Sequence, residues 1–439
     1  MKRQISIIND LIVDVISTAT SVDRLKALSQ TPLYSNALYL MLANIANALF
    51  GFVFWIVAAR FYSSEDVGFA SAAISAASLL AMLSSLGLGY GLIGFLRSSR
   101  NPDSLINSSL TIVGLVSTAA ALIFILGLDA WSPALIFIRD IPIYLVVFVL
   151  FIPVSAVSGL VDHTFVAGCQ AGFVVARNLI FNILRLALSV LLAVFFHSFG
   201  IFGSWSGSLA VSLLVGIFWF LPRAQSGYHP RLTINRKAAS DVLRFSFANH
   251  IGDIFWTAPA LILPIMVVNL VGAGNNAFFY IAWAISGILT MIPGNVSISL
   301  FAEGSHGKAR LEQNVLRSLK MVFLLLVPAV ILVLALADKI LLLFGGPYSQ
   351  GATTLLRLLA VSALPVAINA VYFGMIRTEK KIKTIIGLSA FIGVVTIGLS
   401  FLLLPRIGIT GAGIAWLVSH TGAASAIVIR WLTGRQKAL

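Results

Sequence analysis

The sequence contains very little charge for its length. Only 10% of its 439 residues are Asp, Glu, Lys or Arg, whereas 59% are hydrophobic and the mean hydropathy is +1.00. Because soluble domains carry about 25% charged residues, this composition excludes a water-soluble globule. Apolar runs near or above about 18 residues recur along the whole chain, and each is long enough to cross the hydrocarbon layer of a bilayer.

Cysteine is almost absent, and so are the motifs of most enzymes. Cys169 stands alone, which excludes an intramolecular disulfide and a cysteine-based zinc or iron–sulfur site. The six histidines do not occur at metal-ligand spacing, and there is no Walker A, Gly-x-Ser-x-Gly or His-Glu-x-x-His motif. We therefore expect no metal, no cofactor, no enzymatic activity and no direct use of ATP.

The apolar runs predict an all-α, polytopic membrane protein of about twelve transmembrane helices. They are continuous rather than alternating with period two, which excludes a β-barrel and leaves a helical bundle as the structure that satisfies its backbone in lipid. The predicted spans are approximately residues 34–61, 66–96, 104–128, 141–170, 176–197, 200–221, 241–271, 276–301, 315–337, 352–375, 382–404 and 408–431.

The first thirty residues differ from the spans that follow. Lys2 and Arg3 resemble the start of a signal peptide, but Asn9, Asp10 and Asp14 interrupt the apolar run that a signal peptide requires. The apolar residues instead share one helical face. Residues 1–30 are therefore interpreted as a cytoplasmic amphipathic segment on the membrane surface.

The distribution of basic residues predicts the orientation. If the N-terminus is cytoplasmic, 23 of the 29 Lys and Arg residues fall on the cytoplasmic side, five fall outside, and Arg185 lies within a span. This is the bias of the positive-inside rule. We expect a multi-pass protein of the cell membrane with both termini cytoplasmic, and contact between its net charge of +14 and anionic lipids rather than nucleic acid.

The two halves of the chain resemble each other. The sequence FGIFG at 199–203 matches IGITG at 407–411, and Pro153 matches Pro365, at offsets of 208 and 212 residues. Six helices per half, an even number, make the repeat parallel and place a cavity between two bundles. The predicted units are the N-terminal segment 1–30, an N-terminal bundle at 31–222, a basic cytoplasmic linker at 223–240 and a C-terminal bundle at 241–439.

Two long stretches resemble a known family. Residues 31–96, TPLYSNALYLMLANIANALFGFVFWIVAARFYSSEDVGFASAAISAASLLAMLSSLGLGYGLIGFL, are similar to the opening of the prokaryotic polysaccharide transporters, which include the O-antigen-type flippases of the multidrug/oligosaccharidyl-lipid/polysaccharide (MOP) superfamily. GGPYSQGATTLLRLLAVSALPVAINAVYFGMIRTEKK and PRIGITGAGIAW resemble later helices of the same family. The resemblance implies a flippase for polyprenyl-pyrophosphate-linked oligosaccharides, acting beside the glycosyltransferases or polymerase of a glycan assembly pathway.

A polar stripe in the fifth span is the first candidate substrate site. Asn178, Asn182, Arg185 and Ser189 follow one another at helical spacing on one face. An intramembrane arginine costs at least about 2.5 kcal/mol, so it is expected to face the bundle interior. There Arg185 would bind a pyrophosphate, since guanidinium matches phosphate oxygens in a bidentate fork. The alternative is a side chain that reaches back to the cytoplasmic headgroups.

Three further sets of polar residues are candidates for a function. Asn44 and Asn47 in the first span would bind sugar hydroxyls or else form interhelical hydrogen bonds. His250 and Asp253 are three residues apart, which suggests an ion-coupling pair or a plain ion pair near the cytoplasm. Arg60 is expected to pair with Glu65 or Asp66 rather than to contact substrate.

The leading function is therefore export of a lipid-linked oligosaccharide, the precursor of a surface polysaccharide, from the inner to the outer leaflet by alternating access. One alternative is a cation-coupled multidrug exporter with the same fold, which would require more buried carboxylates than this sequence provides. The other is a membrane-embedded glycan polymerase, which would require larger outer loops.

Overall fold

The computed structural model of the chain describes residues 32–193, 197–304, 311–379 and 381–436. Every regular element in these ranges is a helix, and twelve of the helices described there are long and apolar enough to cross a membrane. The predicted all-α class and helix number are confirmed. The amphipathic segment predicted at 1–30 lies outside the described residues.

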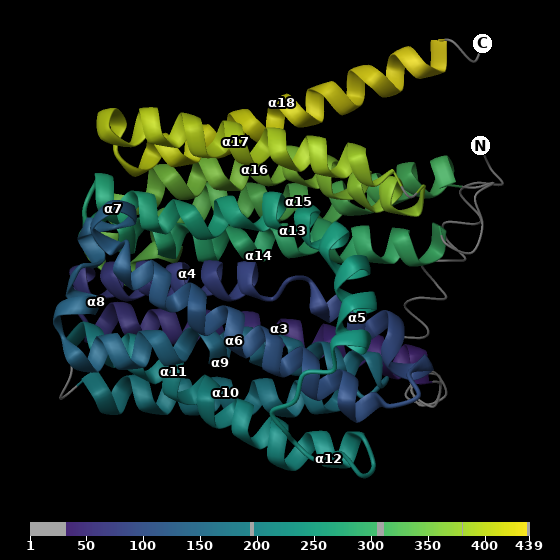
Figure 1. Cartoon of the computed structure of the whole chain (residues 1–439). Helices are drawn as coiled ribbons and strands as arrows, with labels where there is room; N and C mark the ends of the chain where they lie inside the picture. Colours follow the sequence, from purple (N-terminus) through teal and green to yellow (C-terminus); the bar gives the residue numbers. More distant parts are fainter. Residues whose placement is uncertain (1–31, 194–196, 305–310, 380, 437–439) are drawn as a thin grey trace, which may run out of the picture.

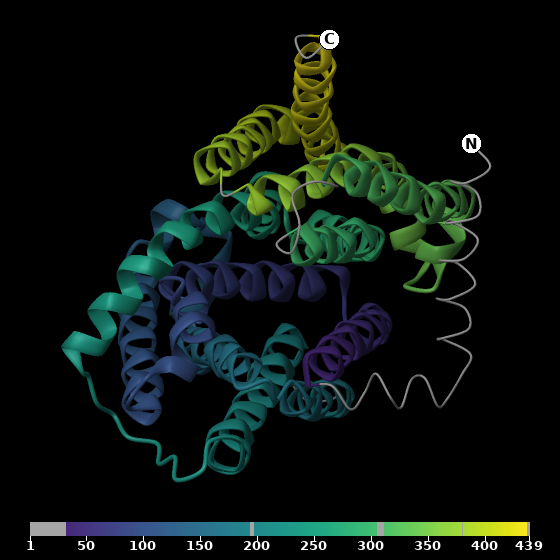
Figure 2. The ribbon, with the colours of Figure 1, turned by 90° about the vertical axis from the view of Figure 1, so that its right-hand side faces the viewer.

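The helices form two bundles (Figure 1). The N-terminal bundle comprises α3 (Pro32–Phe61), α4 (Ser64–Ser84), α5 (Leu88–Phe95), η1 (Leu96–Ser98), α6 (Pro102–Leu126), α7 (Leu128–Trp131), η2 (Pro133–Leu135), α8 (Phe137–Asp140), α9 (Pro142–Ala167), α10 (Gly172–Ala193), α11 (His197–Val215), the π-helical segment η3 (Gly216–Phe220) and α12 (Leu221–Ala224). The C-terminal bundle comprises α13 (Arg236–Leu270), α14 (Ala273–Gly304), α15 (Leu311–Leu342), α16 (Gly346–Thr378), α17 (Ile382–Ile407) and α18 (Ile409–Gln436). Residues 225–235 join the bundles as an irregular segment that runs outside the helices (Figure 2).

Each bundle contains a helix that packs against several others, α10 in the N-terminal bundle and α16 in the C-terminal bundle. In the N-terminal bundle α10 packs against α3 and α11, and in the C-terminal bundle α16 packs against α14, α15 and α18. α4 packs on α9 and α11 of its own bundle and on α13 and α14 of the other. Its run of buried alanines and serines explains this position, because small side chains let helices approach closely in a membrane.

The second predicted span is not one helix. α4 ends at Ser84 and α5 begins at Leu88, because Leu86 and Gly87 adopt left-handed backbone angles, with φ of 51° and 70°. Gly87 also faces α13 so closely that a Cβ would lie 2.6 Å from the carbonyl oxygen of Ser246. The glycine-rich sequence Leu86-Gly87-Leu88-Gly89 is the signal for this break, since Gly87 enters the left-handed conformation without strain.

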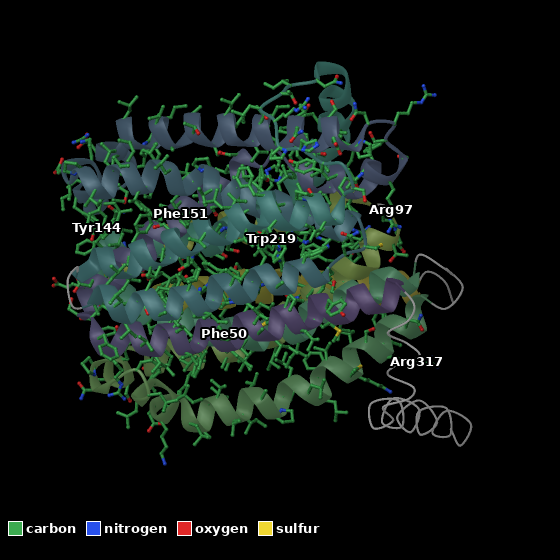
Figure 3. All side chains as sticks on the ribbon, turned by 90° about the horizontal axis from the view of Figure 1, so that it is seen from below. Phe50, Arg97, Tyr144, Phe151, Trp219 and Arg317 are labelled. Atoms are coloured by element: carbon green, nitrogen blue, oxygen red, sulfur yellow. The ribbon has the colours of Figure 1, made fainter. Side chains whose placement is uncertain are left out.

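The ends of the molecule differ in charge. Arg97 and Arg317 lie at one end, which we call the basic end, and Tyr144 lies at the opposite end (Figure 3). The basic end carries the connections that the sequence places in the cytoplasm. The orientation of the termini stays a prediction.

Polar contacts join the two bundles at the opposite end. Arg60 of α3 donates to the carbonyls of Leu342 and Leu343, at 3.0 and 2.9 Å, and so caps the C-terminus of α15. The expected pairing of Arg60 with Glu65 or Asp66 was wrong, because these carbonyls in the other bundle lie within its reach. Asn276 of α14 donates to the carbonyl of Gly68 at 2.7 Å. This end of the interface is closed.

Candidate functional site

A cavity lies between the two bundles. It has a volume of about 190 Å³ and lies between α3 and α14, with Phe344 after α15 completing the wall. It is lined by Asn47, Ala48, Gly51, Phe52, Trp55, Ile281, Ala284, Ile285, Gly287, Ile288, Met291 and Phe344. Among these side chains, only Asn47 and the indole of Trp55 carry polar groups. The cavity predicted between the two bundles is thus present, and its C-terminal wall is apolar.

The polar stripe of α10 stands directly behind the wall that α3 forms. α10 buries Asn182, Arg185 and Ser189 while Ile183 and Leu191 of its apolar face are exposed. A helix that buries its polar face and exposes its apolar face is stable in lipid. Hydrocarbon covers the apolar side chains, and neighbouring helices form hydrogen bonds with the polar ones. Arg185 therefore faces the bundle interior, as the spacing predicted, and not the headgroups.

An aromatic box surrounds the guanidinium of Arg185. Its Cζ lies 4.5 Å from the ring centre of Phe54, 4.7 Å from that of Phe181 and 4.4 Å from that of Trp205. Cation–π contacts of this kind contribute about 0.5–2 kcal/mol each, which offsets the cost of placing the charge in the membrane. No carboxylate of the described residues lies within ion-pair distance of Arg185. Among the described residues, no acidic side chain therefore neutralises its charge.

A short hydrogen-bond relay connects Arg185 to the cavity. Arg185 donates from Nη2 to Asn182 Oδ1 at 2.7 Å, and Asn182 donates from Nδ2 to Asn47 Oδ1 at 2.6 Å. Asn182 also donates to the carbonyl of Asn178 at 2.8 Å, so both N–H groups of its amide are used. Gly51 also lines the cavity. A Cβ added to Gly51 would lie 4.0 Å from Nη2 of Arg185, so the glycine leaves room for the guanidinium.

The structure thus brings three of the predicted substrate residues together. Asn47 lines the cavity, Arg185 lies behind its wall, and Asn182 is hydrogen-bonded to both. Asn178 contributes its backbone carbonyl to this relay. Asn44 is exposed and does not line the cavity. A role in substrate binding stays a prediction for all five.

The predicted pair in α13 has different neighbours. Asp253 accepts a hydrogen bond from the hydroxyl of Tyr90 in α5 and lies 3.6 Å from a guanidinium nitrogen of Arg377 in α16. His250 is buried against Gly87 and, within the described chain, forms no ion pair with Asp253. Asp253 therefore connects α13 to both bundles at the basic end. An ion-coupling role for these residues stays a prediction.

The sequence did not predict one buried ion pair, which Arg177 forms. Arg177, which charge counting assigned to the cytoplasmic side, is 2% exposed and forms a bidentate pair with Asp162 of α9, with both N–O distances 2.9 Å. Ser158 accepts a further hydrogen bond from Arg177 at 2.9 Å. A Cβ on Gly216, where the π-helical segment η3 begins, would lie 2.8 Å from Arg177 Cδ, so the glycine makes room for this side chain.

These contacts define two different arginines in one bundle. Arg177 is neutralised by Asp162 and belongs to the packing of the bundle. Arg185 keeps its positive charge and lies behind the cavity wall with aromatic rings around it. The arrangement can attract an anion to the N-terminal wall of the cavity and offer apolar surface on the other wall.

Comparisons with known proteins agree with this description. The sequence profile of a family described as polysaccharide biosynthesis protein matches residues 33–305. A solved structure of a multidrug resistance MATE family transporter of the MOP superfamily, in an inward-facing conformation, has a TM-score of 0.72 and 16% identity over 89% of this chain and 94% of its own. The lipid II flippase MurJ in an inward closed conformation gives 0.75 and 12% identity over 90% of this chain and 87% of its own.

A further solved structure has the same fold. A MATE family transporter in an outward-facing conformation gives a TM-score of 0.61, with 15% identity over 94% of this chain and 97% of its own. The search of curated proteins found no match. The chain therefore belongs to the polysaccharide biosynthesis protein family, as a multi-pass membrane protein with the fold of the MOP-superfamily transporters.

Proposed function

We propose that this protein is a flippase that moves a polyprenyl-pyrophosphate-linked oligosaccharide from the inner to the outer leaflet of the cell membrane. The observation that carries the proposal is the cation Arg185, which has no acidic partner among the described residues and lies behind the wall of a cavity between two bundles. The family profile supports a role in polysaccharide biosynthesis, and the fold supports transport. The cargo would be the precursor of a surface polysaccharide.

The cavity has the polarity that such a cargo requires. A pyrophosphate needs a cationic partner, and the Arg185–Asn182–Asn47 relay supplies positive charge and an amide on the N-terminal wall. The apolar wall formed by Ala284, Ile288 and their neighbours suits the part of the lipid nearest the phosphate. We infer that the cargo binds with its phosphates towards α3 and α10.

The described form is a resting form rather than a loaded one. Its central cavity of about 190 Å³ is smaller than the roughly 300–1,000 Å³ of typical ligand pockets. An oligosaccharide headgroup would therefore enter only after the bundles separate at the basic end, where Asp253 holds Tyr90 and Arg377. Closure at the opposite end by Arg60 and Asn276 would keep the site sealed from the outside during loading.

The membrane potential can drive this movement without a coupled ion. Each elementary charge gains about 2.3 kcal/mol per 100 mV, so two negative charges moving outward gain about 4.6 kcal/mol per 100 mV of inside-negative potential. A coupling role for His250 and Asp253 would add to this bias. Both termini are proposed to lie in the cytoplasm, on the loading side.

Arg185→Ala tests the proposal most directly. We expect the rate at which the lipid-linked oligosaccharide reaches the outer leaflet to fall about ten- to a hundredfold, because a charge-assisted hydrogen bond contributes about 1.5–3 kcal/mol. Arg185→Lys should retain part of the rate, since it keeps the charge but not the bidentate fork. The measurement is the leaflet distribution of the labelled glycolipid in cells that lack the native gene.

Arg223→Ala is the matched control. Arg223 also stacks on an aromatic ring, with its Cζ 4.2 Å from the ring centre of Trp219, but it lies outside the cavity. Its loss should leave transport near the wild-type rate. Equal rates for wild type, Arg185→Ala and Arg185→Lys would remove Arg185 from the mechanism, and an unchanged leaflet distribution on deletion of the gene would refute the flippase itself.

A cation-coupled multidrug exporter is the second candidate, because the cavity lining is largely apolar. Its lining contains no carboxylate, and Arg185 would repel a cationic drug. The two candidates separate on deletion of the gene. A flippase predicts accumulation of glycolipid in the inner leaflet, and an exporter predicts greater drug sensitivity with intact surface glycans.

A further inference from the structure

One face of α3 lines the cavity between the bundles at regular intervals. Asn47, Gly51 and Trp55 follow one another four residues apart on this helix, and all three belong to the lining. At 1.5 Å per residue, each lies about 6 Å along the helix axis from the next. Gly51 therefore stands between an amide and an indole and has no side chain of its own to cover the wall.

The guanidinium of Arg185 lies directly behind Gly51. A Cβ added to Gly51 would lie 4.0 Å from Nη2 of Arg185, and no other atom of the described residues packed around it comes within that distance. Among the described residues, Asn182 is the one hydrogen-bond acceptor of Arg185, and Nε is buried without an acceptor. The guanidinium thus keeps N–H groups that a ligand can use.

Helix packing does not explain the glycine at position 51. A Cβ on Gly68 would overlap a backbone carbonyl of the other bundle, whereas a Cβ on Gly51 would make only an ordinary van der Waals contact. Glycine is also among the least favourable residues in a helix interior, and alanine is the most favourable. Alanine would therefore fit here and favour the helix, so the missing side chain has another use.

We propose that Gly51 is an aperture in the cavity wall, through which the guanidinium of Arg185 binds the phosphates of the cargo. The inference rests on the proposed function and adds the residue that controls access to its cation. A phosphate oxygen bonded to a guanidinium lies about 2.8 Å from the nitrogen. Between Nη2 and a Cβ placed 4.0 Å away, such an oxygen would overlap the Cβ. A side chain at position 51 therefore excludes the phosphate and leaves Arg185 itself unchanged.

A series of side chains at position 51 tests the aperture. Gly51→Leu should slow delivery of the glycolipid to the outer leaflet about ten- to a hundredfold, as the loss of Arg185 does, because it removes the same charge-assisted hydrogen bond. Gly51→Ala should slow it less. Both variants should keep at least the wild-type midpoint of thermal unfolding, which shows that the fold is intact.

Gly287→Leu is the matched control for loss of cavity volume. Gly287 of α14 lines the opposite wall of the same cavity, and an added Cβ meets nothing within 4 Å. In an Arg185→Ala background Gly51→Leu should cause no further loss, because no charge remains to be covered. Gly287→Leu should cause the same fold-change whether or not Arg185 is present. Losses at Gly51 and Arg185 that multiply would overturn the proposal.

Binding of farnesyl pyrophosphate to the purified full chain in detergent gives a readout that does not require transport. Farnesol, which lacks the phosphates, is the reference ligand, and isothermal titration calorimetry measures both. Gly51→Leu should weaken farnesyl pyrophosphate about tenfold or more relative to farnesol. Gly287→Leu should affect both ligands equally. The proposal is overturned if Gly51→Leu weakens both ligands to the same extent, or if the wild type does not prefer farnesyl pyrophosphate.

Failure of the aperture and failure of the proposed function give different results. Deletion of the gene can trap glycolipid in the inner leaflet while the losses at Gly51 and Arg185 multiply, in which case the flippase stands and the aperture fails. Deletion can instead leave the leaflet distribution unchanged while Gly51→Leu still weakens farnesyl pyrophosphate selectively. The flippase then fails, and the aperture stands as the entrance to an anion site.

Discussion

Asp162→Ala is expected to destabilise the protein by about 3–5 kcal/mol, because it leaves Arg177 buried without a counter-charge. Arg177 is 2% exposed, and the two carboxylate oxygens of Asp162 both lie 2.9 Å from its guanidinium. The pair joins α9 to α10, so its loss should lower the midpoint of thermal unfolding of the purified protein. The measurement is intrinsic fluorescence during heating in detergent.

Two comparisons separate this effect from simple loss of a side chain. Asp129→Ala breaks the ion pair between the exposed side chains of Asp129 and Arg139. Because solvent screens such surface pairs, the midpoint of thermal unfolding of this variant should stay near that of the wild type. The double variant Asp162→Leu with Arg177→Met removes both charges and should recover most of the lost stability. If the double variant were as unstable as Asp162→Ala, the cost would come from packing rather than from the uncompensated charge.

The sequence predicts the helices and the inward face of α10 well, for a physical reason. Continuous apolar runs allow only helices in lipid, and Asn182, Arg185 and Ser189 share a face by helical spacing alone. The two-bundle arrangement also follows from repeats such as 199–203 and 407–411. Each of these inferences depends on residues that are close in sequence or on a simple count.

Contacts between residues that are far apart in the sequence could not be predicted from it. Arg177 and Arg60 both lie near predicted helix ends, where an arginine normally reaches water, yet the first pairs with Asp162 and the second caps α15. Helical spacing pairs Asp253 with His250, but the contacts of Asp253 are Tyr90 and Arg377. In each case the partner is fixed by how helices pack, and spacing along one helix carries no information about that.

Gly68→Ala is expected to push the bundles apart at the opposite end. A Cβ on Gly68 would overlap the backbone carbonyl of Ala273 in α14, and backbone on both sides leaves no flexible atom to give way. Asn276 also donates to the Gly68 carbonyl at this point of contact. Overpacking costs about 1–3 kcal/mol, which moves a two-state equilibrium about five- to 150-fold away from the described form.

The separation of the bundles is measured as the distance between two spin labels at that end of the molecule, one on each bundle. Cysteines replace Trp131 and Lys339, which are exposed on opposite bundles, and serine replaces Cys169, the only native cysteine. Gly68→Ala should shift the distribution to longer distances, whereas Gly159→Ala, where an added Cβ meets nothing within 4 Å, should not. An unchanged distribution in Gly68→Ala would mean that α4 and α14 do not separate there. The outward opening required by alternating access would then have to use another surface.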